Sequence, residues 1–245
     1  MRFNTLCELV RHSVDTFASR VAFSMFEGDD VTYAEAGRRI GKVQQILTEA
    51  GLSAGDKVAL LSSSMPNWGI CYFAVASAGM VVVPILPDFS GEELDMIIEH
   101  SEAKALLVSD KLFTKLSKET IGRLNVVVRT KNLGIIAQRV CGAVTTAEPR
   151  PEDLAAIIYT SGTTSKPKGV MLTHAALCAQ VTLSSSIFPV QADDVFLSVL
   201  PLSHTYECSI GLIYPFSMGA KVVYMDRPPT ASALMPALRA VRPTV

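Results

Sequence analysis

The chain has 245 residues, of which 49% are hydrophobic and 18% are charged, and its formal net charge is −1. This length can bury a sizeable core, as one large or two modest domains, and this composition excludes a disordered chain. The near-neutral charge argues against a surface that coats phosphates, so no nucleic-acid partner is expected. The five cysteines are scattered and never form a C-x-x-C pair, which predicts reduced thiols in a cytoplasmic protein.

Apolar periodicity, capping residues and glycine or proline breaks predict helices and strands in near-strict alternation. In chain order we expect helix 4–19, strand 21–27, helix 33–50, strand 57–62, helix 66–79, strand 81–85, helix 91–102, strand 104–109, helix 110–119, strand 125–129, strand 154–159, helix 173–186, strand 194–200, helix 205–218, strand 221–225 and helix 230–241. Such alternation is typical of right-handed crossovers. The predicted fold class is therefore α/β, with parallel β-sheets flanked by helices through βαβ crossovers.

Two local signals refine these elements. Thr32, Ser90 and Thr173 directly precede predicted helices and are expected to be their N-caps. The uncharged segment 69–86 has the minimum length of a membrane-spanning helix, but Gly79 and Pro84 interrupt it. A buried helix followed by a core strand explains this segment better, so no transmembrane segment is predicted.

The sequence YTSGTTSKPKGV at 159–170 follows the apolar strand 154–159 directly. Ligands of parallel sheets bind at the carboxyl ends of strands. Hydroxyl groups, glycines that allow a close backbone approach and a lysine are the groups that bind phosphate, although a solvated surface loop has the same composition. The spacing does not fit G-x-x-x-x-G-K-[ST], because Pro167 occupies the second glycine position and Gly169 follows Lys168. A Walker-type NTPase is therefore disfavoured.

The same segment resembles the signature Y-T-S-G-T-T-G-x-P-K-G-V of the adenylate-forming superfamily, which includes acyl-CoA synthetases, luciferases and peptide-synthetase adenylation domains. Segments 31–47, 55–68 and 77–98 resemble upstream parts of that family in the expected order. LPLSHTYE at 200–207 is similar to the P-L-x-H-x-x-E form of long-chain fatty acyl-CoA synthetases. The likeness runs from about residue 5 to the last residue and implies an incomplete N-terminal domain of an acyl-CoA synthetase-like fold.

The resemblance implies that this loop binds the β- and γ-phosphates of ATP. The implied phosphate-binding residues are Thr160, Ser161, Gly162, Thr163, Thr164, Ser165, Lys168 and Gly169, with Lys168 supplying a positive charge in catalysis. Ser165 stands where the family usually has glycine. If that position needs a positive φ, serine costs about 1 kcal/mol in strain. An unchanged ATP affinity and loop order in Ser165→Gly would show that glycine is not needed there.

In the second motif the resemblance makes His204 a wall or gate beside the reacting carboxylate, with Tyr206 and Glu207 lining or supporting the acyl pocket. A purely structural role is the alternative for His204. A hydrolase relay of Ser203, His204 and Glu207 is disfavoured, because adjacent side chains diverge and no G-x-S-x-G elbow is present. The uncharged segment 208–220 is expected to pack in the core, with an acyl-channel wall as the alternative.

The family pattern also predicts how the chain is divided. Residues 1–245 are expected to form the incomplete N-terminal domain, with subdomains 52–190 (the first sheet with the phosphate loop) and 1–51 plus 191–245 (part of a second sheet). The adenine and ribose contacts, the ligands of Mg²⁺ and the C-terminal lid domain are expected beyond residue 245, so no metal ligand is expected within the chain. The chain alone is therefore expected to be inactive in adenylation.

The resulting functional interpretation is the N-terminal part of an AMP-forming ligase of the long-chain fatty acid–CoA ligase type. ATP and a fatty acid would form acyl-AMP with Mg²⁺, and CoA as co-substrate would then yield acyl-CoA. One alternative is an enzyme that adenylates an acyl or aminoacyl group and loads a carrier protein. Another is a non-catalytic nucleotide-binding module. Peripheral contact with a membrane and a homodimer both stay open.

Overall fold

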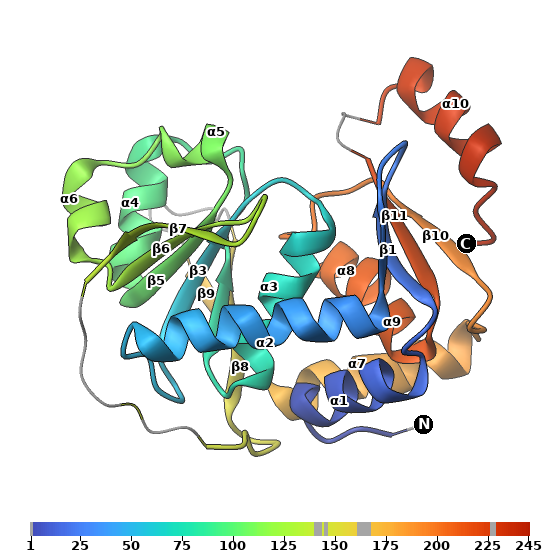
Figure 1. Ribbon diagram of the computed structural model, residues 1–245, viewed down its shortest axis with the longest axis horizontal. Coiled ribbons are helices and arrows are strands. Elements are labelled where there is room, and N and C mark those ends of the chain that lie inside the picture. Colours follow the sequence, from blue (N-terminus) through green and yellow to red (C-terminus); the bar gives the residue numbers. More distant parts are fainter. Residues whose placement is uncertain (1, 140–143, 145–146, 161–167, 226–228) are drawn as a thin grey trace.

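The computed structural model describes residues 2–139, 144, 147–160, 168–225 and 229–245. In this part of the chain the strands form two sheets, one of seven strands and one of four. Figure 1 shows the two sheets side by side, with helices between them and around them. The α/β class, with mostly parallel sheets flanked by helices, is confirmed.

The larger sheet provides the framework for the signature segment. Its strands are β3 (Lys57–Leu61), β4 (Val81–Pro84), β5 (Ala103–Val108), β6 (Val126–Arg129), β7 (Gly134–Gln138), β8 (Leu154–Thr160) and β9 (Lys168–Thr173). Their order is β7-β6-β5-β3-β4-β8-β9. The five central strands are parallel, and β7 and β9 pair antiparallel at the two edges.

The smaller sheet joins segments from both ends of the described chain. Its strands are β1 (Val21–Met25), β2 (Asp30–Thr32), β10 (Val195–Ser198) and β11 (Lys221–Tyr224). Their order is β10-β11-β1-β2, with β1 parallel to β11 and antiparallel to β2. This sheet therefore depends on contacts between residues about 200 positions apart, such as the register pair Phe23 and Val222.

The helices separate the two sheets and cover their outer faces. They are α1 (Leu6–Thr16), α2 (Tyr33–Glu49), α3 (Pro66–Ser77), α4 (Gly91–His100), α5 (Asp110–Phe113), α6 (Lys118–Arg123), α7 (His174–Ile187), α8 (Thr205–Cys208), the π-helix η1 (Ser209–Ile213), α9 (Tyr214–Met218) and α10 (Ala231–Val241). The predicted N-caps are confirmed. Thr32, Ser90 and Thr173 each accept a hydrogen bond from a backbone N–H in the first helical turn.

Helix α3 explains the long uncharged segment. Residues 66–76 of this helix are all buried, because α3 contacts α1 and α2 as well as strands of both sheets. Trp68 is fully buried and stacks on Tyr72 with ring centroids 5.6 Å apart. No described helix combines the length and the apolar character that a membrane crossing requires. The prediction of a buried helix followed by a core strand is confirmed.

The large sheet is buried on both faces, which explains its unbroken apolar runs. Along β3, Val58 and Leu60 belong to the main core with α2 and α3, whereas Ala59 and Leu61 belong to a second core with α4. Successive residues of a strand point to opposite faces, so a strand between two helical layers has no polar side. Strands that are apolar on both faces account for part of the high hydrophobic fraction of the chain.

One expectation about a helix was wrong, and another is confirmed with a local variation. Segment 110–119 is not one helix, because Ser117 accepts a hydrogen bond from Thr120 N at 3.1 Å and starts α6 as a separate helix. Segment 205–218 is helical but contains a π-helix in its middle. The antiparallel strands β2 and β7 were also missed. Strand β2 pairs with β1, and β7 pairs with β6, in each case after a short turn. Both strands have few buried residues, so their sequences lack an apolar pattern that would predict a strand.

Candidate functional site

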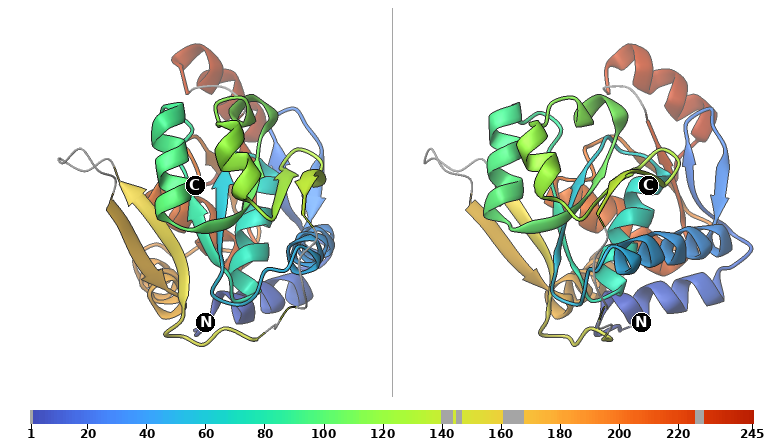
Figure 2. Two further views of the ribbon diagram at one scale, coloured as in Figure 1. Left: turned by 90° about the vertical axis from the view of Figure 1, so that its left-hand side faces the viewer. Right: turned by 60° about the vertical axis from the view of Figure 1, so that its left-hand side comes forward.

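The signature segment begins at the carboxyl end of β8. Strands β8 and β9 form an antiparallel hairpin in which Thr160 is the register partner of Lys168. Figure 2 shows this hairpin in yellow at the margin of the molecule. The predicted phosphate-binding residues between these two positions, Ser161, Gly162, Thr163, Thr164 and Ser165, lie outside the described residues. Thr160 and Lys168 thus mark the two ends of the segment in space.

The described residues of this hairpin end are accessible. Thr160, Lys168 and Gly169 are all exposed, and the Lys168 ammonium group has no hydrogen bond or ion pair with another described residue. Gly169 also has a packing role, because a Cβ atom there would lie 2.8 Å from Cγ2 of Ile157 and 3.4 Å from the Tyr159 ring.

Tyr159 connects the base of the segment to α4. Its hydroxyl group and Nδ1 of His100 are 2.6 Å apart, and the two rings meet edge to face at 86°. Tyr159 is buried, and this burial raises its pKa. His100 itself is exposed. Nothing in its local sequence signals a contact that spans 59 positions.

The second motif has both buried and exposed residues. His204 is the N-cap of α8, and its Nδ1 accepts a hydrogen bond from the backbone N–H of Tyr206 at 3.3 Å. The His204 and Tyr206 side chains are exposed, whereas Glu207 is buried. Ser203 is also buried, and its Oγ has no hydrogen-bond partner among the described residues. A Ser203–His204–Glu207 relay is therefore absent.

Glu207 ties α8 to the end of β10. Its Oε1 accepts a hydrogen bond from Ser198 Oγ at 2.5 Å. Burial raises the pKa of Glu207, and the Ser198 hydrogen bond opposes that shift. Gly211 in η1 leaves room for the carboxylate, since a Cβ atom there would lie 2.5 Å from Oε1. Single π-helical turns within α-helices are frequent at functional sites.

Further buried polar groups lie in the core around this acid. The Tyr224 hydroxyl group has no hydrogen-bond partner among the described residues, and the Tyr72 hydroxyl group lies against the Cys208 thiol. Burial, followed by the negative charge of Glu207, holds the pKa of Tyr224 well above its ordinary value. Buried polar groups in native proteins are usually satisfied, often by ordered water. Tyr224 on β11 therefore places a further polar group in the buried core close enough to sense the Glu207 charge.

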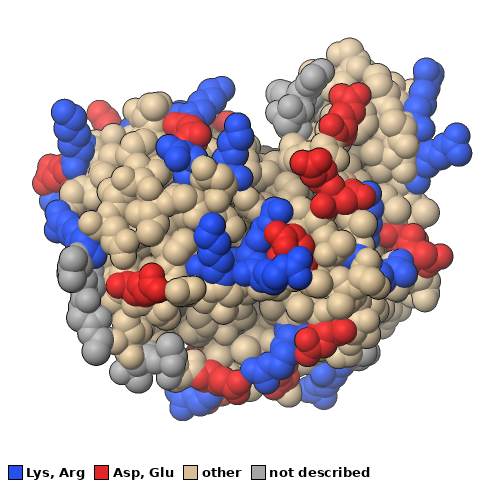
Figure 3. Space-filling model, in the orientation of Figure 1, with Lys and Arg blue, Asp and Glu red and all other residues tan. Residues whose placement is uncertain are grey.

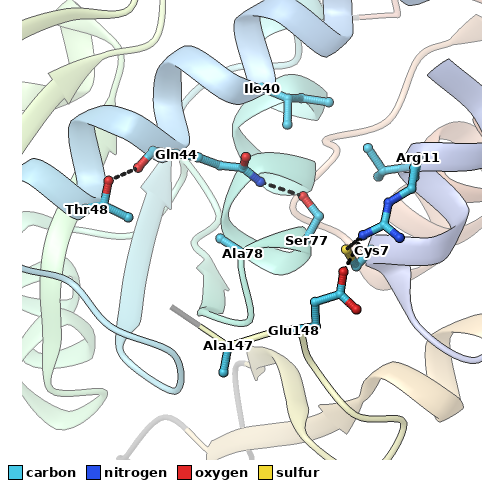
Figure 4. A pocket seen from close by; sticks show the side chains of 10 residues that line it. Cys7, Arg11, Ile40, Gln44, Thr48, Ser77, Ala78, Ala147 and Glu148 are labelled. Carbon is cyan, nitrogen blue, oxygen red and sulfur yellow. Dashed lines mark hydrogen bonds and ion pairs between the residues drawn. The ribbon is translucent and has the colours of Figure 1, made fainter. Parts of the chain in front are cut away.

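A pocket of about 520 Å³ lies between α1, α2 and α3 at the amino end of β4 (Figure 4). Arg11 and Glu148 form an ion pair of 2.5 Å at its mouth, and burial raises the pKa of the neighbouring Cys7 thiol. This pocket faces the edge of the sheet opposite to Thr160. Ligands of parallel sheets bind at the carboxyl edge, so we assign this pocket no part in the site. No group of three or more His, Cys, Asp and Glu residues able to hold a metal occurs among the described residues.

The fold places the hairpin at the carboxyl edge of a parallel sheet, and comparison with known proteins identifies the family of the chain. The family model described as AMP-binding enzyme matches residues 10–245. The chain therefore belongs to the AMP-binding enzyme family, whose members form adenylates, as its signature segment indicates.

Curated relatives carry several different names. Crotonobetaine/carnitine–CoA ligase of Proteus sp. (strain LE138) is 30% identical over 212 residues, which cover 80% of this chain and 41% of that protein. The peroxisomal long chain acyl-CoA synthetase 6 of Arabidopsis thaliana is 30% identical, and the match covers 98% of this chain and 38% of that protein. The chain thus spans about two fifths of the length of these relatives.

Solved structures match the fold over nearly the whole chain. ATP-bound MatB from Rhodopseudomonas palustris is 25% identical, with a TM-score of 0.78 over 98% of this chain and 48% of that chain. The nonribosomal peptide synthetase FmoA3 in its AMPPNP-bound form has a TM-score of 0.82 at 22% identity, which shows a shared fold.

Proposed function

We propose that the chain is the ATP-phosphate-binding part of an acyl-CoA ligase that activates a fatty acid as acyl-AMP. The observation that carries this proposal is the position of Thr160 and Lys168 as register partners at the carboxyl end of β8, with the family signature between them. The likeness to the plant long chain acyl-CoA synthetase favours a long-chain substrate. The likeness to crotonobetaine/carnitine–CoA ligase makes a small polar acid the competing substrate.

In this proposal the Lys168 ammonium group stabilises the negative charge that develops on the departing pyrophosphate. This ammonium group is exposed and has no partner among the described residues, which supports an approach to the β- and γ-phosphates. Hydrogen-bond donors aimed at developing charge contribute strongly to catalysis where water is excluded. Ser161 to Ser165 and Gly169 would complete the phosphate-binding set, as the signature implies.

His204 and Glu207 have different proposed roles. His204 is exposed at the start of α8 and would stand beside the reacting carboxylate as a gate. Glu207 would act as a positioning residue, because its bond to Ser198 fixes α8 against β10. The exposed Tyr206 would face the acyl chain. We also propose that 52–190 and 1–51 plus 191–245 act as subdomains, each built on one sheet.

We propose that the residues that bind Mg²⁺ and CoA lie outside residues 1–245. The described residues provide no cluster that fits a divalent cation, so no catalytic step is assigned to one here. We propose that the chain alone does not form acyl-AMP. The free, buried thiols of Cys71, Cys178 and Cys208 support the cytoplasm as its compartment.

Calorimetric titration of the chain with ATP tests the phosphate site. We expect binding that weakens about tenfold in Lys168→Gln, the factor for one lost charge-assisted hydrogen bond. Lys118→Gln, which removes an exposed lysine of α6, is the matched control and is expected to bind like the wild type. Equal affinity in all three proteins would contradict the proposal.

A carrier-protein-loading enzyme is the second candidate, since structures of nonribosomal peptide synthetases share the fold. Pyrophosphate exchange by the protein with its complete adenylating domains, screened over fatty, small polar and amino acids, separates the substrate classes. Transfer to CoA or to a phosphopantetheine-bearing carrier then separates the acceptors. ATP binding without any exchange would favour a non-catalytic nucleotide-binding module.

A further inference from the structure

A basic pocket of about 450 Å³ lies over α2, remote from the β8–β9 hairpin. Four cationic side chains and one carboxylate line it, so its lining is strongly positive although the whole chain has a net charge of −1. Figure 3 shows Lys and Arg side chains gathered around an acidic side chain over α2. The residues that matter are Glu35, Arg38, Arg39, Lys42, Asn67 and Lys131.

One face of α2 supplies most of the charge. Glu35, Arg38, Arg39 and Lys42 are spaced at three, four and seven positions, which places them on the same side of a helix. Glu35 accepts from Arg39 Nε at 2.7 Å and from Arg38 Nε at 2.9 Å. The single carboxylate thus orients both guanidinium groups, and each keeps further N–H groups for a ligand.

A buried amide connects this face to two other elements. Asn67 at the start of α3 is 7% exposed, and its Oδ1 accepts from Arg39 Nη1 at 3.2 Å. Its Nδ2 donates to the carbonyl groups of Thr130 at 2.7 Å and Lys131 at 3.1 Å, just after β6. Asn67 therefore holds Arg39 and the backbone of Lys131 in one arrangement before any ligand arrives, which lowers the entropy cost of binding.

Two lysines reach the pocket without a partner. The side chains of Lys42 on α2 and Lys131 after β6 are exposed, and neither has an ion pair or side-chain hydrogen bond with another described residue. Oriented guanidinium groups beside unpaired ammonium groups form the donor set that binds phosphate oxygens.

We propose that this pocket binds a phosphate monoester or diphosphate group, at a site separate from the signature segment. Strands β5, β3 and β4 lie between β6 and β8, so the two sites are about 19 Å apart across the sheet, at about 4.8 Å per strand. The phosphate group belongs either to a soluble phosphorylated compound or to the headgroup of an anionic lipid.

The test is an NMR titration of the chain carrying Lys168→Gln with inorganic pyrophosphate. That background substitution weakens binding at the signature segment. We expect the backbone amides of Lys131 and Asn132 to shift, with an affinity that falls about tenfold or more when Lys42→Gln and Lys131→Gln are added. Lys111→Gln with Lys118→Gln makes the same change in net charge on α5 and α6, and we expect it to leave the affinity within twofold.

A second arm uses co-sedimentation with phosphatidylcholine vesicles that contain phosphatidate. If pyrophosphate binding depends on Lys42 and Lys131, the site binds a soluble phosphate compound. If only vesicle binding depends on these two lysines, the site binds a lipid headgroup. The proposal is overturned if neither probe binds. It is also overturned if both double variants weaken binding equally, because binding would then follow net charge alone.

Discussion

The Glu207 carboxylate fills the space beside the α-carbon of Gly211, one turn further along the same helix. Its Oε1 also accepts a hydrogen bond from the Ser198 hydroxyl group. The Glu207 side chain therefore contacts both η1 and the end of β10. The absence of a side chain at residue 211 is thus a condition for the buried hydrogen bond.

Gly211→Ala is expected to destabilise the protein by about 1–3 kcal/mol. The added methyl group must displace the carboxylate from Ser198, and a buried acid that loses its hydrogen bond is costly. Urea unfolding measures the change. Gly41→Ala in α2 is the matched control, because nothing lies within 4 Å of a Cβ atom at residue 41. Alanine is the better helix former, so this control should be neutral or stabilising. Equal stabilities of the two variants would show that Glu207 tolerates the change.

Glu207→Gln is expected to gain stability relative to the wild type as the pH rises above about 4.5. The pKa of Glu207 is higher in the folded state than in the unfolded state. The protonated carboxyl group therefore stabilises the fold fully at a pH below the unfolded-state pKa. This stabilisation is lost as the pH rises through the folded-state pKa. Glutamine does not ionise and lacks this loss. The difference in unfolding free energy between the two proteins should grow from pH 4 to 7. Glu92→Gln, at an exposed residue of α4, is the matched control for the loss of one carboxylate.

His174→Asn is expected to have the opposite pH dependence. His174 is fully buried at the start of α7, its Nδ1 accepts from Leu6 N at 3.2 Å, and burial lowers its pKa to about 4. Its contribution to stability is present above the unfolded pKa and disappears as the pH falls from 6.5 toward 4. The wild type should lose about 3 kcal/mol from this group by pH 4. Asparagine keeps an acceptor and does not titrate. If the unfolding free energies of the two proteins changed with pH in parallel, protonation of His174 would not be the cause of the loss.

Tyr159→Phe and His100→Ala are each expected to cost about 1 kcal/mol, the value of one hydrogen bond. In the double variant the losses should not add, because either change alone removes the same bond. Hydrogen exchange of the β8 and β9 amides should accelerate in all three variants. Additive free energies would indicate that His100 and Tyr159 act independently.

Sequence patterns predicted most of the fold because its strands and helices are marked by local signals. Thr32 and Ser90 are caps that act within one turn, and β3 and β8 are apolar runs bounded by breaks. The domain boundaries proposed for the two sheets stay a prediction. Short edge strands such as β7 were not predicted from the sequence, because pairing with a neighbouring strand defines them more than their composition does.

The candidate site was predictable only where a motif was contiguous. The signature at 159–170 and the motif at 200–207 were recognised because the residues of each are neighbours in the sequence. The contacts of His100 with Tyr159, and of Asn67 with Arg39 and Thr130, join residues that are 28 or more positions apart. Packing of the whole chain brings such pairs together, and no local spacing specifies them.

Helix α3 has a consequence for how the molecule unfolds. Leu212 lies where a side chain at Gly69 would be, and the same helix contacts β1 in one sheet and β3 in the other. Apolar side chains from both sheets, such as Phe23 and Val58, belong to one continuous core around it. Neither sheet can separate without exposing this shared helix to water. The calorimetric and van't Hoff enthalpies of melting should therefore agree, as they do for a single cooperative unit.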